Sequence, residues 1–402
     1  DIFIFTELET KKIIDTILIP AAQKYLNMSP KECNQLYYIF GVDGKYGRHY
    51  SFLKAISAFW QVLIDDNIKG TFKIDLDQVF PQEELKNETG SFAFEHFKTP
   101  LWGAEGEDSE GNKLELGMIA GALVNENDID TSLFVPDVPF PKKELTGDEL
   151  IFFSHLPQAI STEAEMMTLY EDTASIDGKE ACLQRIHVTG GTTGILINSL
   201  RKYHPFTPTF IGRAEDQAYI LSVLFKDSEK NLRYLHKDGL IMRHDKEAFA
   251  GEAIKAAKIG KTIGDYTRIL WFSYYVKALE WEFQKTKNTL DPFTGCFVSH
   301  IPFTIVYLRL ALKAASLFTS KQEEKIKEGV RFLELGSKRL FEISQKLSSN
   351  SNPLLEEYER EKNAWKLYYD ILDILEKKII EHDPLALDLK QKAKSLIQEA
   401  NI

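Results

Sequence analysis

The spacing of apolar residues divides the chain into two parts near residue 250. Before that point, short apolar runs alternate with segments whose apolar residues recur at the 3.6-residue spacing of a helix, the first of which begins at Ile13. Such alternation of strand-like and helix-like segments predicts an α/β layer architecture. After that point the pattern is helical. We therefore expect an α/β domain over residues 1–250 and a helical appendage over residues 251–402.

The helical appendage contains three predicted helical segments. Two of them cover residues 252–285 and 301–347 and are rich in Trp, Tyr and Leu. The third carries an apolar stripe at helical spacing from Tyr368 to Ile379 and ends near Pro384. Aromatic residues in such stripes are more typical of a core than of a sugar-binding platform.

Composition excludes several classes of protein. The 402 residues carry a formal net charge of -11. This overall negative charge disfavours binding to nucleic acid or to an anionic membrane. No apolar run approaches the ~20 residues of a membrane-spanning helix, so we expect no integral membrane segment. Cys33, Cys182 and Cys296 show neither a disulfide framework nor zinc-ligand spacing, which fits a reducing, cytoplasmic location.

Two carboxylates one residue apart follow a short apolar run. On a strand, Asp75 and Asp77 point to the same side, and both can turn toward one hard cation if the strand ends there. Phe80 and Pro81 follow, and proline cannot extend a β ladder, so the pair should lie at the carboxyl edge of a sheet, where α/β folds bind ligands. Taken alone, the motif also fits a solvated acidic turn.

A second acidic pair, Glu215 and Asp216, lies far downstream. It follows a glycine turn at Gly212 and precedes apolar residues at helical spacing, which places both acids in the first turn of a predicted helix. The helix dipole favours negative charge there, so plain capping is the alternative role. Further on, a turn predicted at residues 237–239 leads into a short strand that ends in His244, a candidate metal ligand.

Together these segments resemble the GT-A glycosyltransferases, in particular those of the family 2 type and the mannosylglycerate synthases. The order and approximate spacing of the motifs are similar to that family over residues 40–250. One departure is that the chain begins at Asp1 without the family's first nucleotide-binding strand, which leaves the base of the donor unpredicted. Four local matches carry the resemblance: Gly47-Arg48, Asp75 with Asp77, Gly190-Gly191-Thr192, and Arg213 with Glu215 and Asp216.

The resemblance implies a GT-A, Rossmann-like nucleotide-sugar domain, with a donor half at about 1–140 and an acceptor half at about 141–250. It also implies a metal-dependent transfer of a sugar from a nucleotide-sugar donor to a hydroxyl group of a small-molecule or glycan acceptor. Mg²⁺ or Mn²⁺ would stabilise the leaving diphosphate. The metal ligands implied are Asp75, Asp77 and His244.

The same resemblance distributes the remaining roles. Asp216 would be the general base, and Glu215 would hydrogen-bond an acceptor hydroxyl. The implied donor-binding residues are Gly47, Arg48, Asp75 and Lys246, and the implied acceptor-binding residues are Gly190, Gly191, Thr192 and Arg213.

Two other functions stay open from the sequence. Asp75 also suits the nucleophile of a haloacid dehalogenase-type phosphatase, although the residues after Asp77 fit that motif poorly. The chain also fits a non-catalytic, GT-A-derived binding module, because the first nucleotide-binding strand is not recognisable. Whichever of the three functions holds, the helical appendage is a candidate contact surface for a homo-oligomer.

Overall fold

The computed structural model describes most of the chain. Within the described segments, the backbone alone is described at 46, 78, 88, 122–124, 236, 238–239, 241–244 and 246–258. The described segments are residues 1–43, 46–74, 78–107, 111–124, 193–212, 214–224, 230–244, 246–287, 298–347 and 352–401.

A mixed six-stranded sheet forms one layer of the protein, in the order β1-β5-β4-β6-β2, with β3 paired to β4. β4 and β6 are parallel, whereas every other pair in the described sheet is antiparallel. The strands are β1 (Gly70–Lys73), β2 (Gln78–Val79), β3 (Glu105–Glu107), β4 (Lys113–Val124), β5 (Thr193–Leu196) and β6 (Asn231–His244).

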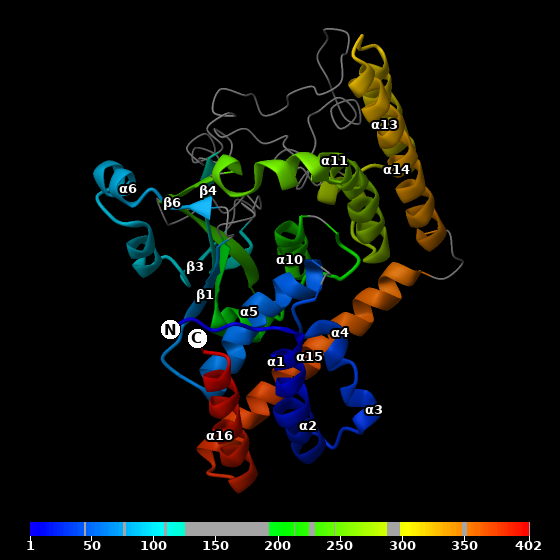
Figure 1. The fold of residues 1–402 in the computed structure, drawn as a ribbon. Helices are drawn as coiled ribbons and strands as arrows, with labels where there is room; N and C mark the ends of the chain where they lie inside the picture. The colour runs from blue at the N-terminus through cyan, green and yellow to red at the C-terminus, as the bar shows by residue number, and fades with distance from the viewer. Residues whose placement is uncertain are drawn as a thin grey trace.

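Helices pack on the sheet and on one another (Figure 1). The N-terminal helices are α1 (Glu7–Ile13), the π-helix η1 (Ile14–Leu18), α2 (Ile19–Tyr25), α3 (Pro30–Cys33), α4 (Leu36–Ile39) and α5 (Tyr46–Leu63). The middle of the chain adds α6 (Gln82–Thr89), the 3-10 helix η2 (Ala93–Lys98), α9 (Ile197–Tyr203) and α10 (Glu215–Leu224). The last helices are α11 (Lys246–Ala278), α13 (Pro302–Phe318), α14 (Glu323–Leu347), α15 (Pro353–Ile380) and α16 (Pro384–Glu399).

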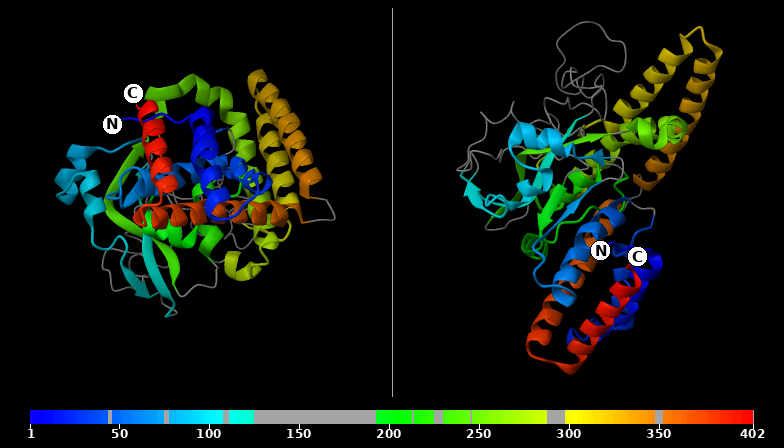
Figure 2. Two further views of the ribbon diagram at one scale, coloured as in Figure 1. Left: turned by 90° about the horizontal axis from the view of Figure 1, so that it is seen from below. Right: turned by 60° about the vertical axis from the view of Figure 1, so that its left-hand side comes forward.

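Helix α5 lies between the sheet and the C-terminal helices. It packs on β1, α9 and α10 on one side and on α15 on the other, where the Tyr368 hydroxyl donates to the Ala55 carbonyl at 2.8 Å. The N-terminal helices pack on α15 and α16, and the two termini meet in a bridge between Phe3 and Asn401. Figure 2 shows that α13 and α14 form a hairpin that projects from this body.

The expected α/β architecture with a helical C-terminal region is confirmed at that level. The predicted helix from Ile13 onward is found, and α15 and α16 begin at Pro353 and Pro384, first-turn positions where proline loses no helical hydrogen bond. The boundary placed at residue 250 lies within α11. Among the described helices, none is long and apolar enough to cross a membrane.

Two sequence predictions are wrong. Residues 301–347 form two helices, α13 and α14, rather than one. The turn predicted at 237–239 is part of β6: the register shifts between the Ala120↔His236 and Ala122↔Ile241 pairs, so an irregular, bulge-like stretch of β6 accommodates the extra residues.

Candidate active site

The carboxyl ends of β1, β4 and β6 lie at the same edge of the sheet. β1 and β4 are both antiparallel to β5, and β6 is parallel to β4, so all three strands run toward the same edge. Lys73, the last residue of β1, is opposite Thr193 in β5, and His244, the last residue of β6, is opposite Gln78 in β2. The carboxyl edge is where open α/β sheets bind ligands.

The predicted metal motif adjoins this edge in the sequence. Asp75 and Asp77 lie outside the described residues, and so does the side chain of His244. Gln78 directly follows Asp77 and is paired with His244, and Cα atoms of such antiparallel pairs are ~4.5–5.5 Å apart. This register is consistent with an approach of Asp77 and His244, whereas their metal coordination stays a prediction. Among the described residues, no three His, Cys, Asp or Glu side chains form a group suited to a metal.

Asp216 lies in the first turn of α10 and is only 7 % exposed. The residue before the helix, Ala214, has a φ of 59°, a left-handed conformation that costs a non-glycine residue ~1–2 kcal/mol. The Ala218 amide donates to the Ala214 carbonyl at 3.1 Å, and the Thr207 hydroxyl donates to the Glu215 carbonyl. A strained residue held by its surroundings therefore sets the direction of both acidic side chains.

The pKa of the Asp216 carboxyl is raised to about 6, and burial is the largest cause. The negative charge of Glu215 acts in the same direction as burial. The positive charges of Lys73 and Arg268 and a hydrogen bond from the backbone amide of Gln217 lower this pKa. Burial and the Asp216 charge also raise the pKa of Tyr234. The cluster thus brings together side chains from β1, β6, α10 and α11. A carboxylate with a pKa near 6 is ionised at neutral pH and basic enough to accept a proton.

Helix α5 supplies a fully buried lysine, Lys54, which is 1 % exposed. Its Nζ atom donates to the carbonyl oxygen of Thr193 at 3.3 Å and to Thr193 Oγ1 at 3.1 Å. The hydroxyls of Tyr50 and Thr193 are hydrogen-bonded at 3.0 Å, and Lys73 Nζ lies 5.6 Å from the centre of the Tyr50 ring. Lys54 and Tyr50 thereby fix the start of β5, which follows the predicted glycine loop in the sequence.

Several buried polar groups in and around this cluster are unpaired within the described part of the chain. Gln217 is 2 % exposed, and neither its amide nitrogen nor its amide oxygen has a hydrogen-bond partner. The same holds for the Tyr219 hydroxyl and for Nε of Arg268. Buried polar groups are paired in the large majority of cases, so this concentration next to Asp216 is unusual.

Arg48, predicted to bind the donor, lies in a network that ties α5 to the N-terminal helices. Its buried guanidinium donates to Glu7 Oε1 at 2.8 Å and to Asp43 Oδ1 at 2.5 Å. It also donates to the carbonyl oxygens of Tyr37 at 3.1 Å and Phe40 at 3.0 Å. The described contacts give Arg48 a structural role whether or not it also binds a ligand.

The other predicted binding residues have different outcomes. Gly47 is pressed against the segment before α10: a Cβ atom there would lie 2.5 Å from the Pro208 carbonyl oxygen, so glycine is required for this approach. Lys246 begins α11, with its side chain outside the described residues. Four predicted acceptor-binding residues lie outside the described residues altogether: Gly190, Gly191, Thr192 and Arg213.

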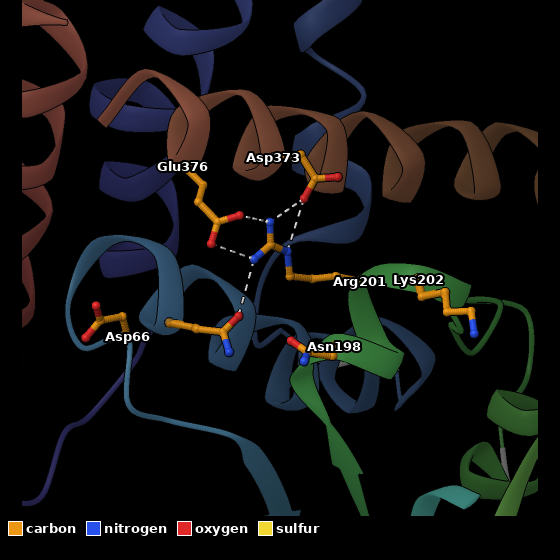
Figure 3. A pocket seen from close by; sticks show the side chains of 7 residues that line it. Asp66, Asn198, Arg201, Lys202, Asp373 and Glu376 are labelled. Carbon is orange, nitrogen blue, oxygen red and sulfur yellow. Dashed lines mark hydrogen bonds and ion pairs between the residues drawn. The ribbon is translucent and has the colours of Figure 1, made fainter. Parts of the chain in front are cut away.

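A second charged cluster lines a cavity of about 470 Å³ between α5, α9 and α15 (Figure 3). Arg201 Nε donates to Asp373 at 3.1 Å, and the two terminal nitrogens donate to Asp373, to both oxygens of Glu376 and to Gln61 at 2.5–3.3 Å. All five guanidinium N–H groups are therefore used by the protein. This arrangement joins three helices and leaves Arg201 no donor for a ligand.

Sequence reasoning identified Glu215 and Asp216 but missed the basic and aromatic residues around them. Tyr50 and Lys54 are four residues apart on the buried face of α5, and a lysine in an otherwise apolar helix face was the available signal. Comparisons of the chain with protein-family models, with curated proteins and with solved structures found no match. The function of this site therefore has to be inferred from its own residues.

Proposed function

We propose that this protein is a metal-dependent glycosyltransferase that moves a sugar from a nucleotide-diphosphate sugar to a hydroxyl group of a small-molecule or glycan acceptor. The observation that carries the proposal is the Asp216 cluster. It combines a buried carboxylate whose pKa is raised to about 6, a strained backbone position at Ala214 and two nearby cations, Lys73 and Arg268. Perturbed titratable groups at a sheet edge are typical of active sites.

The chemistry requires a base and a means of stabilising the leaving group. Asp216 would take the proton of the acceptor hydroxyl while the oxygen of that hydroxyl bonds to the anomeric carbon. The bond between the anomeric carbon and the diphosphate oxygen would break, and its electron pair would leave with the diphosphate. Lys73 and Arg268 are suited to stabilise the negative charge that develops there.

The predicted metal ligands complete the proposal. Asp75, Asp77 and His244 offer two carboxylates and an imidazole, a donor set that suits Mg²⁺ or Mn²⁺. Such an ion supplies further charge stabilisation to a diphosphate. The pairing of Gln78 with His244 supports the proximity that this ligand set requires.

A GT-A arrangement of the sheet is part of the proposal. We place the donor at the carboxyl end of β1, next to the segment with Asp75 and Asp77, and the acceptor at α10, next to Asp216. The mixed sheet and its shared carboxyl edge support this division.

Thermal denaturation of the whole chain tests the proposal. A panel of UDP-, GDP- and ADP-sugars is added with and without Mn²⁺, and one nucleotide is expected to raise Tm only when the metal is present. Asp77→Asn should remove this shift, whereas Asp388→Asn, a matched change of an exposed acid on α16, should not. Absence of any shift would favour the binding module, and a phosphoenzyme trapped on Asp75 would establish the phosphatase.

A further inference from the structure

A buried carboxylate on α15 contacts the segment that leads into α10. Glu361 is only 2 % exposed, and both of its oxygens accept from the Thr209 amide, at 3.2 and 3.0 Å. The Thr209 hydroxyl donates to Oε1 of Glu361 as well, and to Oε1 of Glu357 at 3.1 Å. Thr209 is thus held between two acidic side chains about one turn apart on α15.

Thr209 belongs to residues 206–211, which we call the entry segment because they lead from α9 to α10. Within this segment, the Thr207 hydroxyl donates to the carbonyl oxygen of Glu215, the residue directly before Asp216. Thr207 and Thr209 are only two residues apart in the chain. A displacement of Thr209 would therefore be passed on to the backbone that carries the Asp216 side chain.

Further contacts fix the entry segment between α5, α10 and α15. The Thr207 amide donates to Ser51 Oγ of α5 at 2.9 Å. The ring of Phe206 is stacked on the ring of Tyr358 of α15, with 5.1 Å between the ring centres. The Tyr358 hydroxyl in turn donates to the Ser222 carbonyl of α10 at 3.3 Å. Helix α15 therefore contacts both the entry segment and the helix that follows it.

The charge of Glu361 is costly to the folded state. The pKa of this carboxyl is raised to about 7, with burial as the largest cause and the charge of Glu357 acting in the same direction. Hydrogen bonds from Thr209 and the charge of Arg360 lower this pKa. A glutamine would avoid the cost of the charge, but only one of its side-chain atoms accepts hydrogen bonds. The advantage of a carboxylate here is that both oxygens accept from Thr209.

We propose that Glu361 is a positioning residue: it fixes Thr209 and, through the entry segment, the direction of the Asp216 carboxylate. The proposal rests on the proposed function, in which Asp216 is the general base. Glu361 acts through the backbone and does not touch the substrate. The alternative is a contact that only joins α15 to the rest of the protein, and the two roles predict different kinetics.

A double-mutant cycle with Asp216 tests the proposal. Glu361→Gln should lower kcat about tenfold, because the base is misdirected, while the KM of the donor and the Tm stay close to those of the wild type. In the Asp216→Asn background the same change should alter the residual kcat by less than about twofold, because no base remains to be directed. An equal loss of kcat in both backgrounds would overturn the proposal.

Variants of Thr209 test the same contact from its other side. Thr209→Val removes the hydroxyl but keeps the amide, so kcat should fall by about threefold to fivefold. Thr209→Ser keeps both donors and should have the kcat of the wild type. Glu356→Gln, a change of an exposed acid on α15, is the matched control for Glu361→Gln and should leave kcat unchanged. Equal kcat of Thr209→Val and Glu361→Gln to the wild type would contradict the positioning role.

Hydrogen exchange of the full chain gives a measurement that does not require activity. In Glu361→Gln, the amides of the entry segment and of the first turn of α10 should exchange faster than in the wild type, whereas those of α16 should not. Unchanged exchange at both places would overturn the proposal. If the wild type transfers no sugar but Glu361→Gln still exchanges faster there, the glycosyltransferase is refuted and the coupling of Glu361 to the start of α10 is supported.

Discussion

The Arg201 cluster and the Asp216 cluster are packed against opposite ends of α5 and differ in how their polar groups are paired. All five N–H groups of Arg201 donate to protein acceptors, whereas the side-chain amide of the buried Gln217, in the Asp216 cluster, has no hydrogen-bond partner among the described residues. Completed pairing stabilises the folded state, and a buried carboxylate with a raised pKa destabilises it. The completed pairing of Arg201 gives that cluster a role in the fold, whereas the Asp216 cluster has the features on which we base the proposed active site.

The largest expected effect is on turnover. Asp216→Asn removes the proposed base, so turnover should fall by ~10²- to 10⁴-fold, with little change in donor affinity. In the wild type, turnover should fall as the pH drops through about 6, because Asp216 then becomes protonated. Steady-state kinetics and nucleotide titration measure both effects.

Asp77→Asn is the companion variant, since it should weaken metal-dependent donor binding as well as turnover. Near wild-type turnover of Asp216→Asn would show that the base is wrongly assigned. In that case a retaining mechanism, in which Asp216 only positions the acceptor, becomes the better explanation.

The second effect is on stability, and it has the opposite sign. The pKa of Asp216 is about 6 in the folded state against an ordinary value of 3.8, so between these values the folded state holds a proton that the unfolded state has released. Stability therefore falls as the pH rises through this window, and the penalty is complete above about pH 6. Asp216→Asn removes the charge, so its stability relative to the wild type should increase across the window by up to ~3 kcal/mol.

Urea denaturation of both proteins at about pH 4 and at neutral pH measures this difference. Asp388→Asn, an exposed acid, is the control and should show no comparable change. A relative stability that does not vary with pH would mean that Asp216 is not destabilising in its ionised form.

The third effect tests the other cluster. Arg201→Met leaves Asp373 and Glu376 without their shared cation, and the free energy of unfolding should fall by ~2 kcal/mol. The value is below that of a fully buried pair because both carboxylates are about half exposed. Turnover per folded molecule should not change. Arg360→Met, an exposed arginine on α15, is the control, and a loss of turnover in Arg201→Met would contradict the division between the two clusters.

The sequence predicted those parts of the site that depend on neighbouring residues. Glu215 and Asp216 were placed at a helix start because a glycine turn and a helical apolar pattern flank them. The sequence does not indicate Tyr50 and Arg268, because their interaction with Asp216 depends on how α5 and α11 pack, and no local pattern encodes that packing. The order of the strands in the sheet could not be predicted either, because it also depends on contacts between residues far apart in the sequence.

The two wrong predictions also have local causes. Lys237, Asp238 and Gly239 have the composition of a turn, but the same residue types suit a bulge, and pairing with β4 selects the bulge. The connection between α13 and α14, residues 319–322, contains neither glycine nor proline, so the end of the first helix carried no signal.

The smallest expected effect concerns the strained residue at the start of α10. Ala214→Gly relieves a left-handed conformation but gives the unfolded chain more freedom, so the free energy of unfolding should rise by no more than ~1 kcal/mol. Turnover should fall a few-fold, because the backbone that directs Asp216 becomes less restricted. Asn27→Gly is the matched control: Asn27 has a φ of 54° but lies in an exposed position after α2, and its change should leave turnover intact. Equal turnover of Ala214→Gly and the wild type would mean that the left-handed conformation of residue 214 does not determine the direction of the Asp216 side chain. If Ala214→Gly is instead more stable but slower than the wild type, the strained conformation contributes to turnover.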